Sequence, residues 1–458
     1  MKEYSINHYE IIDSNIPWLG NIPNNWKLHR LDKLFEIRKE DPLESDQRVT
    51  AYLDGRVTLR SNVKGQKIKG VVKEAGWQRI HRGDFAISGM NAHIGGMGVS
   101  DSLGKCSPIY LVLIPKLGFN VYFISHVVRY TAHIGALKNL VNTIRYNSAD
   151  FKKDDLKKIW VWLPPLEEQN AIVRYLDYTD RRIKRYIRAK QKLIKLLEEE
   201  KQAIIYRTVT RGLNKEVRFK PSGIDWVDYI PENWEVLPGK TCFLERKTSN
   251  KGLIEQTVLS LSYGKIIVKP EEKLHGLVPT SFETYQIIDN NDIIVRPTDL
   301  QNDKVSLRFG LSTQRGIITS AYLCLKTKEK LFPQYGYLFL HCLDLNKIIY
   351  RLGSGLRQNL RWEDFKYLQI LMPPLQEQLE ICNFINSSNK KIEEQIHLLR
   401  TEISLLSEYR TRLIADVVTG KLDVREAAAE LPEELEDDEE IEENDAEDEE
   451  ELQEELDP

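Results

Sequence analysis

Side chains suited to nucleic acid gather in four polar segments, two in each half of the chain. In the major groove of DNA, arginine pairs well with guanine and asparagine or glutamine with adenine, while lysine mostly holds phosphates. Polar loops occur on every protein surface, so it is their recurrence in both halves that favours a DNA interface. The candidate DNA-binding residues are Arg60, Asn62, Lys64, Gln66, Lys67 and Lys69 in the first segment, Asn142, Arg145 and Tyr146 in the second, Arg296, Thr298, Gln301, Asn302 and Lys304 in the third, and Arg351, Ser354, Arg357, Gln358 and Asn359 in the fourth.

Motifs for catalysis are missing by contrast. The run from Gly98 to Gly104 and Lys105 resembles a phosphate-binding loop, but it is one residue too long and lacks the Ser or Thr that would hold Mg²⁺. Both Pro-Pro pairs are followed by Leu, so neither forms the Asn/Asp-Pro-Pro-aromatic segment with which amino-methyltransferases hold a flipped adenine. The five cysteines are scattered without a CxxC pair and indicate neither a disulfide framework nor a zinc site. We therefore expect a binding protein with no catalytic residues, metal or cofactor of its own.

The net charge of −4 conceals a strong asymmetry along the chain. Of the 69 acidic residues, 20 lie between positions 426 and 458, where no Lys or Arg occurs, so 65 basic residues face 49 acidic ones in the rest. A basic body indicates a polyanionic partner, most often nucleic acid. The acidic tail cannot bury enough apolar surface to fold alone, and we expect it to be disordered. It either solubilises the chain or covers a basic groove as an electrostatic competitor when DNA is absent.

The elements that must position the polar segments are duplicated. A Pro-Pro-Leu-x-Glu-Gln motif at 164–169 returns at 373–378, and an Ile-Pro-x-x-Trp motif at 22–26 returns at 230–234. Between these anchors, over residues 30–150 and 240–360, the two copies have little in common. Constant frames around divergent interiors indicate one fold that carries two different specificities.

Each copy ends in a long helix with a heptad pattern. The residues expected to pair the helices are Leu176, Ile183, Leu197 and Ile204 in the first and Ile385, Ile392, Leu399, Leu406 and Leu413 in the second. Helices of about 42 residues with so narrow an apolar seam need a partner along their length. They could pair with each other, with a second chain, or with both in turn, and effective concentration favours pairing within the chain. If the helices pair antiparallel, the two domains lie at opposite ends. Lys190 interrupts the first seam, where it either fixes the register or extends its amine to solvent.

The pattern divides the chain into five segments and predicts the α+β class. We expect a mixed α/β domain at 1–162, a long helix at 163–213, a second mixed domain at 214–371, a second long helix at 372–425 and the acidic tail at 426–458. The longest apolar run, at 109–115, is far too short to cross a bilayer, and the N-terminus shows no signal segment. We expect a soluble, cytoplasmic chain without a membrane partner.

This pattern resembles the specificity subunits of type I restriction-modification enzymes. The resemblance rests on the two Pro-Pro-Leu-x-Glu-Gln motifs, the long helices after them, the two Ile-Pro-x-x-Trp motifs and the approach to the second helix at 353–359. It covers residues 15–425, whereas the acidic tail is not part of the usual pattern. The first half also lacks a Gly-Ser-Gly-like approach to its helix.

The resemblance implies that each mixed domain is a target recognition domain, and that each recognises one part of a split, asymmetric site in double-stranded DNA. The two helices would pair as an antiparallel coiled coil and set the gap between the parts. The subunit itself would neither methylate nor cut. It would assemble with two modification subunits, which carry S-adenosylmethionine and methylate adenine, and with restriction subunits that translocate and cleave DNA using ATP and Mg²⁺.

Two other functions stay open from the sequence. A stand-alone DNA-modifying enzyme with an unrecognised active site would transfer methyl groups without partners. A coiled-coil scaffold that binds only proteins would not retain DNA. Binding driven by phosphate contacts would instead weaken steeply as salt rises.

Overall fold

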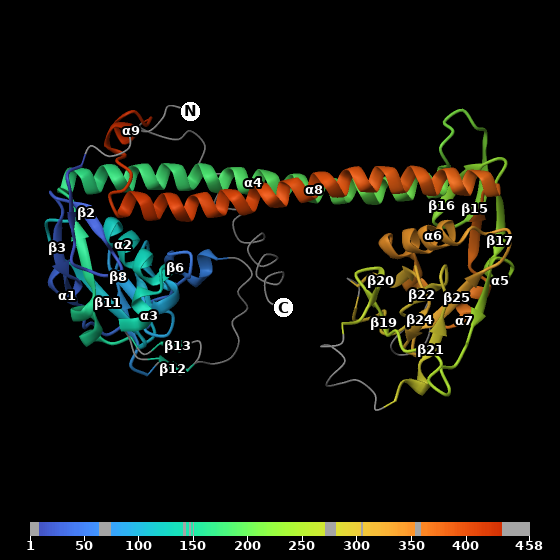
Figure 1. Ribbon diagram of the computed structural model, residues 1–458, viewed down its shortest axis with the longest axis horizontal. Helices are drawn as coiled ribbons and strands as arrows, with labels where there is room; N and C mark the ends of the chain where they lie inside the picture. The colour runs from blue at the N-terminus through green and yellow to red at the C-terminus, as the bar shows by residue number, and fades with distance from the viewer. Residues whose placement is uncertain are drawn as a thin grey trace. The chain divides into compact units, whose positions relative to one another are not determined.

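The computed structural model describes residues 9–63, 75–140, 143–145, 148–149, 151–270, 281–303, 306–352 and 359–432, with the backbone alone at 143–145 and 148–149. The chain forms two compact units (Figure 1). The first unit comprises residues 1–188 and 403–458, and the second comprises residues 189–402. Each unit therefore contains one mixed α/β domain together with parts of both long helices. Among the described residues, no helix is long and apolar enough to cross a membrane.

The first unit is built around an antiparallel four-stranded sheet with the order β4-β11-β8-β9. Its strands are β1 (Ile11–Asp13), β2 (Asn21–Pro23), β3 (Lys27–Arg30), β4 (Phe35–Ile37), β5 (Val49–Ala51), β6 (Val57–Leu59), β7 (Gln78–Ile80), β8 (Phe85–Ser88), β9 (Met97–Val99), β10 (Gly104–Cys106), β11 (Tyr110–Pro115), β12 (Thr143–Arg145), β13 (Ser148–Ala149) and β14 (Trp160–Leu163). Its shorter helices are α1 (Leu31–Leu34), η1 (Arg60–Asn62), η2 (Ala92–Ile94), α2 (Val121–His133), α3 (Ala136–Leu140), η3 (Lys153–Lys158) and α9 (Arg425–Ala429).

The second unit repeats this architecture with a sheet in the order β18-β25-β22-β23. Its strands are β15 (Phe219–Ile224), β16 (Val227–Pro231), β17 (Glu235–Pro238), β18 (Phe243–Arg246), β19 (Leu259–Ser262), β20 (Lys265–Val268), β21 (Gln286–Ile288), β22 (Ile293–Val295), β23 (Phe309–Leu311), β24 (Gly316–Ile318), β25 (Leu323–Thr327) and β26 (Gln369–Met372). Its shorter helices are α5 (Gly239–Cys242), η5 (Phe282–Thr284), α6 (Pro333–Leu345), η6 (Ile348–Arg351) and α7 (Trp362–Lys366). The predicted α+β class and the tandem repeat of mixed domains are confirmed.

The last glutamine of each Pro-Pro-Leu-x-Glu-Gln motif joins three elements in its own unit. The Gln169 amide donates to Pro164 O at 2.7 Å, and its oxygen accepts from the backbone N of Asn120, the N-cap of α2, at 2.8 Å. Gln378 repeats the arrangement with Pro373 O at 2.9 Å and Phe332 N at 2.8 Å. Both glutamine side chains are buried, so their amide groups depend on these backbone partners for hydrogen bonds. The motif therefore fixes where a long helix leaves its domain.

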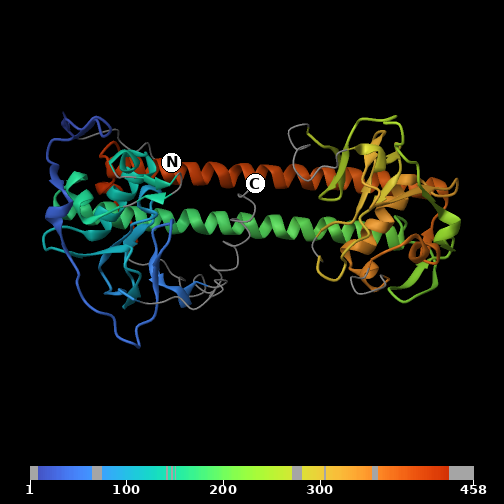
Figure 2. The ribbon, with the colours of Figure 1, turned by 90° about the horizontal axis from the view of Figure 1, so that it is seen from below.

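The two long helices pack together, as the heptad pattern predicted. Helix α4 spans Leu166–Arg211 with 46 residues, and α8 spans Leu375–Val418 with 44 residues. In the first unit, Asp180 of α4 forms an ion pair with Arg410 of α8. In the second unit, Lys201 of α4 pairs with Glu393 of α8. The partner on α8 moves toward lower numbers as the position on α4 rises, so the pairing is antiparallel; Figure 2 shows both helices from below.

The seam between the helices is buried toward the domains and half-buried elsewhere. The pairing residues Leu176, Ile183, Ile385, Ile392 and Leu413 are buried, whereas Leu197, Ile204, Leu399 and Leu406 are half-buried. The difference in burial arises because a seam between only two helices has no third element to cover it where no domain packs against it.

Lys190 lies within the seam and has a partner on the other helix. Its amine is 2.6 Å from Glu402 Oε2, and both residues belong to the second unit. Of the two roles considered for Lys190, this contact supports a role in fixing the register, because the pair forms only when the two helices align at these positions. Exposed pairs contribute little stability by themselves.

Each unit is closed by the C-terminal end of the long helix that began in the other copy of the repeat. Val417 and Val418 of α8 lie in the hydrophobic core of the first unit, where the Trp162 indole N–H donates to Val418 O. Ile205 and Val209 of α4 lie in the core of the second unit. The core of each domain is therefore complete only when both long helices are present.

The chain remains folded beyond the predicted start of the acidic tail. Helix α9 covers Arg425–Ala429, and Val424 and Ala428 are buried in the core of the first unit. The prediction of a disordered tail from residue 426 is thus wrong for 426–432. The Ala-rich segment packs against the core, and the acidic residues around it in the sequence gave no sign of this contact. The rest of the tail, 433–458, lies outside the described residues.

Candidate nucleic-acid interface

The structure brings the third and fourth polar segments together in the second unit. The backbone N of Asp299 donates to Asn359 Oδ1 at 2.9 Å, and the backbone N of Leu360 donates to Pro297 O at 2.8 Å. Asp299 has a φ of 61°, which turns the loop back on itself. Two segments that are about sixty residues apart in the chain therefore form one surface.

A fully buried arginine holds the third segment in place. Arg308, which is 0% exposed, donates through Nη1 to Thr298 O at 2.7 Å and through Nη2 to Asp299 O at 3.3 Å and to Asp303 O. Its Nε donates to the Tyr350 hydroxyl at 3.2 Å. The planar guanidinium can donate in several directions at once, so it satisfies carbonyls along the inside of the loop. Arg308 is a positioning residue that sequence reasoning missed.

A buried carboxyl lies beside Arg308. Asp344 is 0% exposed, and its Oδ2 accepts from the backbone N of Arg308 at 2.6 Å. Burial raises the pKa of this carboxyl to about 6, against smaller opposing effects of the hydrogen bond from the Arg308 backbone and of the nearby cations Lys347 and Arg308. Near neutral pH the carboxylate therefore balances part of the buried positive charge.

The side chains predicted to contact DNA from this surface differ in their exposure to solvent and in their present partners. Gln301, Asn302, Arg351 and Asn359 are exposed, whereas Thr298 is half-buried. Arg296 is bound to Asp303 by an ion pair of 3.3 Å, so it must give up or share this partner to contact a base or a phosphate.

In the first unit, Arg60 and Asn62 lie in η1, directly after the β5–β6 hairpin. Both side chains are exposed, and they are bound to the hairpin: Arg60 Nε donates to Thr50 Oγ1 at 3.0 Å and Asn62 Nδ2 donates to Thr58 Oγ1 at 2.9 Å. These contacts fix the direction in which the two polar side chains leave the surface.

Two arginine–aromatic pairs that sequence reasoning missed lie on or beside the same hairpin. The Arg48 guanidinium lies 5.2 Å from the Trp77 ring centroid, and that of Arg56 lies 5.8 Å from the Tyr52 ring centroid. Arginine and aromatic side chains together suit nucleic acid, since they combine charge with stacking surface. The arginines close to β5 and β6 in the sequence were the available signal.

The remaining candidates are not placed by side chain. Arg145 lies in β12, of which only the backbone is described. Lys64, Gln66, Lys67, Lys69, Asn142, Tyr146, Lys304, Ser354, Arg357 and Gln358 lie outside the described residues.

The two divergent interiors share one short run, at 83–87 in the first copy and 291–295 in the second, and its aspartate has a structural role. Asp84 pairs with Arg38 at 2.6 Å and Asp292 pairs with Arg246 at 3.0 Å, in equivalent positions before β8 and β22. Each carboxylate also accepts a backbone N–H of the preceding turn. These pairs, in which the carboxylates are buried and the arginines half-buried, fix the sheet and do not belong to the interface.

The described residues offer little support for redox or metal chemistry. All five cysteines are buried, and burial raises the pKa of Cys106 to about 12, so this thiol is a poor nucleophile. Among the side chains that the structure describes, no three His, Cys, Asp or Glu residues gather as metal ligands.

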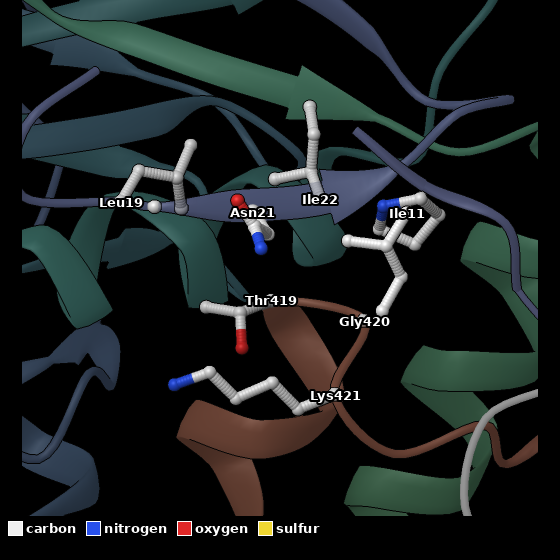
Figure 3. A pocket seen from close by; sticks show the side chains of 9 residues that line it. Ile11, Leu19, Asn21, Ile22, Thr419, Gly420 and Lys421 are labelled. Carbon is white, nitrogen blue, oxygen red and sulfur yellow. The ribbon is translucent and has the colours of Figure 1, made fainter. Parts of the chain in front are cut away.

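A cavity of about 360 Å³ lies in the first unit where the N-terminal hairpin meets the end of α8. Figure 3 shows Ile11 and Asn21 from the hairpin on one side and Thr419 and Lys421 on the other. None of the candidate DNA-binding residues lines it. We interpret it as a junction between the start of the domain and the helix that closes it.

Comparisons with known proteins agree with this arrangement. Residues 23–196 match the family described as "Type I restriction modification DNA specificity domain". Over 431 residues, the chain is 24% identical to a protein of Methanocaldococcus jannaschii named for the specificity subunit of the type I restriction enzyme MjaX, covering 89% of this chain and 96% of that one.

A solved structure shares the fold. A chain from the work "Structural basis underlying complex assembly and conformational transition of the type I R-M system" has a TM-score of 0.64 and 15% identity and covers 88% of this chain and 99% of its own length. The HsdS subunit from Thermoanaerobacter tengcongensis matches with a TM-score of 0.46, 16% identity and coverage of 88% and 98%.

The chain thus contains two mixed domains of matching strand order, and the first of them lies within the match to the DNA specificity domain family. The resemblance expected from the sequence is confirmed: residues 23–196 match the specificity-domain family, and most of the chain is similar in sequence to a protein named as a type I specificity subunit.

Proposed function

We propose that the chain recognises a bipartite site in double-stranded DNA, with one target recognition domain for each part. The observation that carries this proposal is that two domains of the same topology present different polar loops, η1 with the β5–β6 hairpin in one and residues 296–303 with Asn359 in the other. A single small domain distinguishes only a few base pairs, and each wrong pair costs about 1–3 kcal/mol. Two domains on one chain add their discrimination, because the second contact becomes intramolecular.

In this proposal the paired helices set the spacer between the two half-sites. Each domain core is completed by both helices, so the pairing register of α4 and α8 controls where each domain is held. One turn of B-DNA is about 34–36 Å, and a change in register would present one domain to the wrong face of the duplex.

The chain would act without catalytic residues of its own. It would dock two modification subunits, which bring S-adenosylmethionine and methylate adenine, and restriction subunits that use ATP and Mg²⁺. The paired long helices would also supply docking surface for the modification subunits. The sequence similarity to the specificity subunit from Methanocaldococcus jannaschii supports this assignment.

The experiment that tests the function maps methylated adenines in DNA exposed to the chain together with its co-encoded methyltransferase. We expect methylation at one split motif with a fixed spacer. Replacing residues 30–150 with those of another family member should change one half-site only. Methylation without partner subunits would instead favour a stand-alone enzyme, and the absence of salt-sensitive DNA retention would favour a protein scaffold.

Insertions test the role of the helices. Four residues inserted beside Lys190 and four beside Leu399 should change the spacer that is methylated, while both half-sites keep their sequence. If the permitted spacer survives these insertions unchanged, the helices do not set it.

A further inference from the structure

One face of the first long helix is lined with arginine. Arg174, Tyr178, Arg181, Arg185 and Arg188 follow one another at spacings of four, three, four and three residues, which places them on one side of α4. We call these five residues the arginine stripe. Each arginine is two residues from a position of the seam, so the stripe lies on the side of α4 opposite α8. Arg174, Arg181 and Arg185 are exposed, and Arg188 is half-buried.

The fold does not require these charges. The equivalent positions of the second long helix, 209 residues further on, are Asn383, Ser387, Lys390, Glu394 and His397. They contain one lysine and one glutamate where the stripe has four arginines. Both helices pack in the same way against their domains, so the stripe is a property of the first copy alone. A charge pattern that the duplicate lacks indicates a partner that the duplicate does not have.

The residues that follow α8 bring the chain to the arginine stripe. After α8, helix α9 packs into the first unit near the start of α4 (Figure 1). The Arg425 guanidinium lies 4.8 Å from the Tyr9 ring centroid and fixes this turn. Arg174 then donates through Nη2 to Leu431 O at 2.8 Å and to Pro432 O at 3.2 Å. The first arginine of the stripe thus holds the last residues before the acidic tail.

The charge and length of the tail match the stripe. Residues 433–458 comprise 26 residues, of which 18 are acidic and none is Lys or Arg. The stripe extends over about 21 Å of helix from Arg174 to Arg188, whereas 26 extended residues can span about 85 Å. A tail tethered at one end has an effective concentration of roughly millimolar or more near its anchor. Weak ion pairs therefore suffice to hold it there.

We propose that residues 433–458 dock in cis on the arginine stripe of α4. The tail then covers a cationic helix face with its own carboxylates and denies that face to other polyanions. The interaction is electrostatic and multivalent, so it weakens as salt rises and screening shortens the reach of each charge to about 3 Å at 1 M. Nucleic acid is the alternative occupant, and the hydrogen bond from Arg174 to Pro432 O favours the tail.

The proposal can be tested on the full-length chain. Because all five native cysteines are buried, Asp445→Cys supplies one accessible thiol for a benzophenone photo-crosslinker. We expect irradiation at low salt to link the tail to peptides from α4 between residues 174 and 188, and expect about 0.5 M salt to abolish the link. Mixing with isotopically labelled chain distinguishes docking in cis from docking on a second copy, since the latter gives products of mixed mass.

Two matched triple variants distinguish docking of the tail on the arginine stripe from a general attraction of the tail to positive charge. Arg181→Gln, Arg185→Gln and Arg188→Gln together should lower the yield of the link roughly threefold or more. The same loss of charge at Lys33, Lys138 and Lys153, exposed elsewhere in the first unit, should leave it unchanged. Links to other regions, products of mixed mass, or an equal effect of the two triple variants would each overturn docking on the stripe. None of these outcomes bears on which DNA site the two domains recognise.

Discussion

The loop at 296–303 should depend on Arg308, and Arg308→Met tests this dependence. Methionine keeps an unbranched apolar stem but donates no hydrogen bond, so the carbonyls of Thr298 and Asp299 lose their partner. The bond to Asp344 uses the backbone N of Arg308 and is kept.

The cost can be worked from the contacts. Each buried acceptor left without a donor costs about 1–3 kcal/mol, and breaking a buried charged network by removing one partner costs about 3–5 kcal/mol. The acceptors lie in a surface loop that water can enter, so we expect a loss of about 3 kcal/mol in the free energy of unfolding of the second unit. This is less than the stability of an ordinary domain, about 5–15 kcal/mol, so the unit should stay folded while the loop loosens.

Three measurements check this prediction. Urea unfolding gives the loss of stability, and hydrogen exchange should show faster exchange at 296–303 with unchanged protection in the first unit. Methylation mapping should show relaxed recognition of one half-site only. Arg315→Met is the matched control, because that side chain is 52% exposed in its ion pair with Asp289 at 3.2 Å and should contribute less than about 1 kcal/mol. Equal effects of the two variants, or unchanged exchange at 296–303, would refute the reasoning.

Two further predictions use differences within the chain. Trp26→Phe should lower the free energy of unfolding by about 1–2 kcal/mol more than Trp234→Phe, as measured by urea unfolding. The Trp26 indole donates to Glu168 at 2.9 Å, whereas the buried Trp234 indole has no partner among the described residues. Equal losses in the two variants would contradict this reasoning. Burial lowers the pKa of His341 from 6.5 to about 4, so its contribution is present above about pH 6.5 and is lost as the pH falls toward 4. His341→Phe should therefore flatten the fall in unfolding free energy between pH 7 and pH 5, and an unchanged slope would count against a buried neutral imidazole.

Local patterns were enough to predict the architecture. The heptad positions predicted both long helices and their pairing, because an apolar stripe of that length must be covered by a partner. The repeated motifs predicted one topology used twice, and the two sheets have matching strand orders. A seam has two positions in each heptad, and the apolar pattern identified only one of them. The other positions, such as Asp180 and Arg410, were omitted because they are polar.

The candidate interface was less accessible to sequence reasoning. The third and fourth segments were found by composition, but their contact through Asp299 and Asn359 joins residues sixty positions apart. Arg308 escaped notice because its neighbours in the chain do not reveal that it is buried. A charged residue in a polar stretch is usually exposed, and only the surrounding carbonyls explain why this one is not.

The sequence by itself determined the duplication, the two long helices and the separation of a basic body from an acidic tail, since repeats, periodicity and charge are local properties of the chain. Only the tertiary structure decided that each domain core is closed by the end of the other copy's helix, and that the tail begins where Arg174 holds Pro432. The physical reason is that such contacts depend on which surfaces meet when apolar area is buried, and a one-dimensional pattern does not specify the partner of a surface.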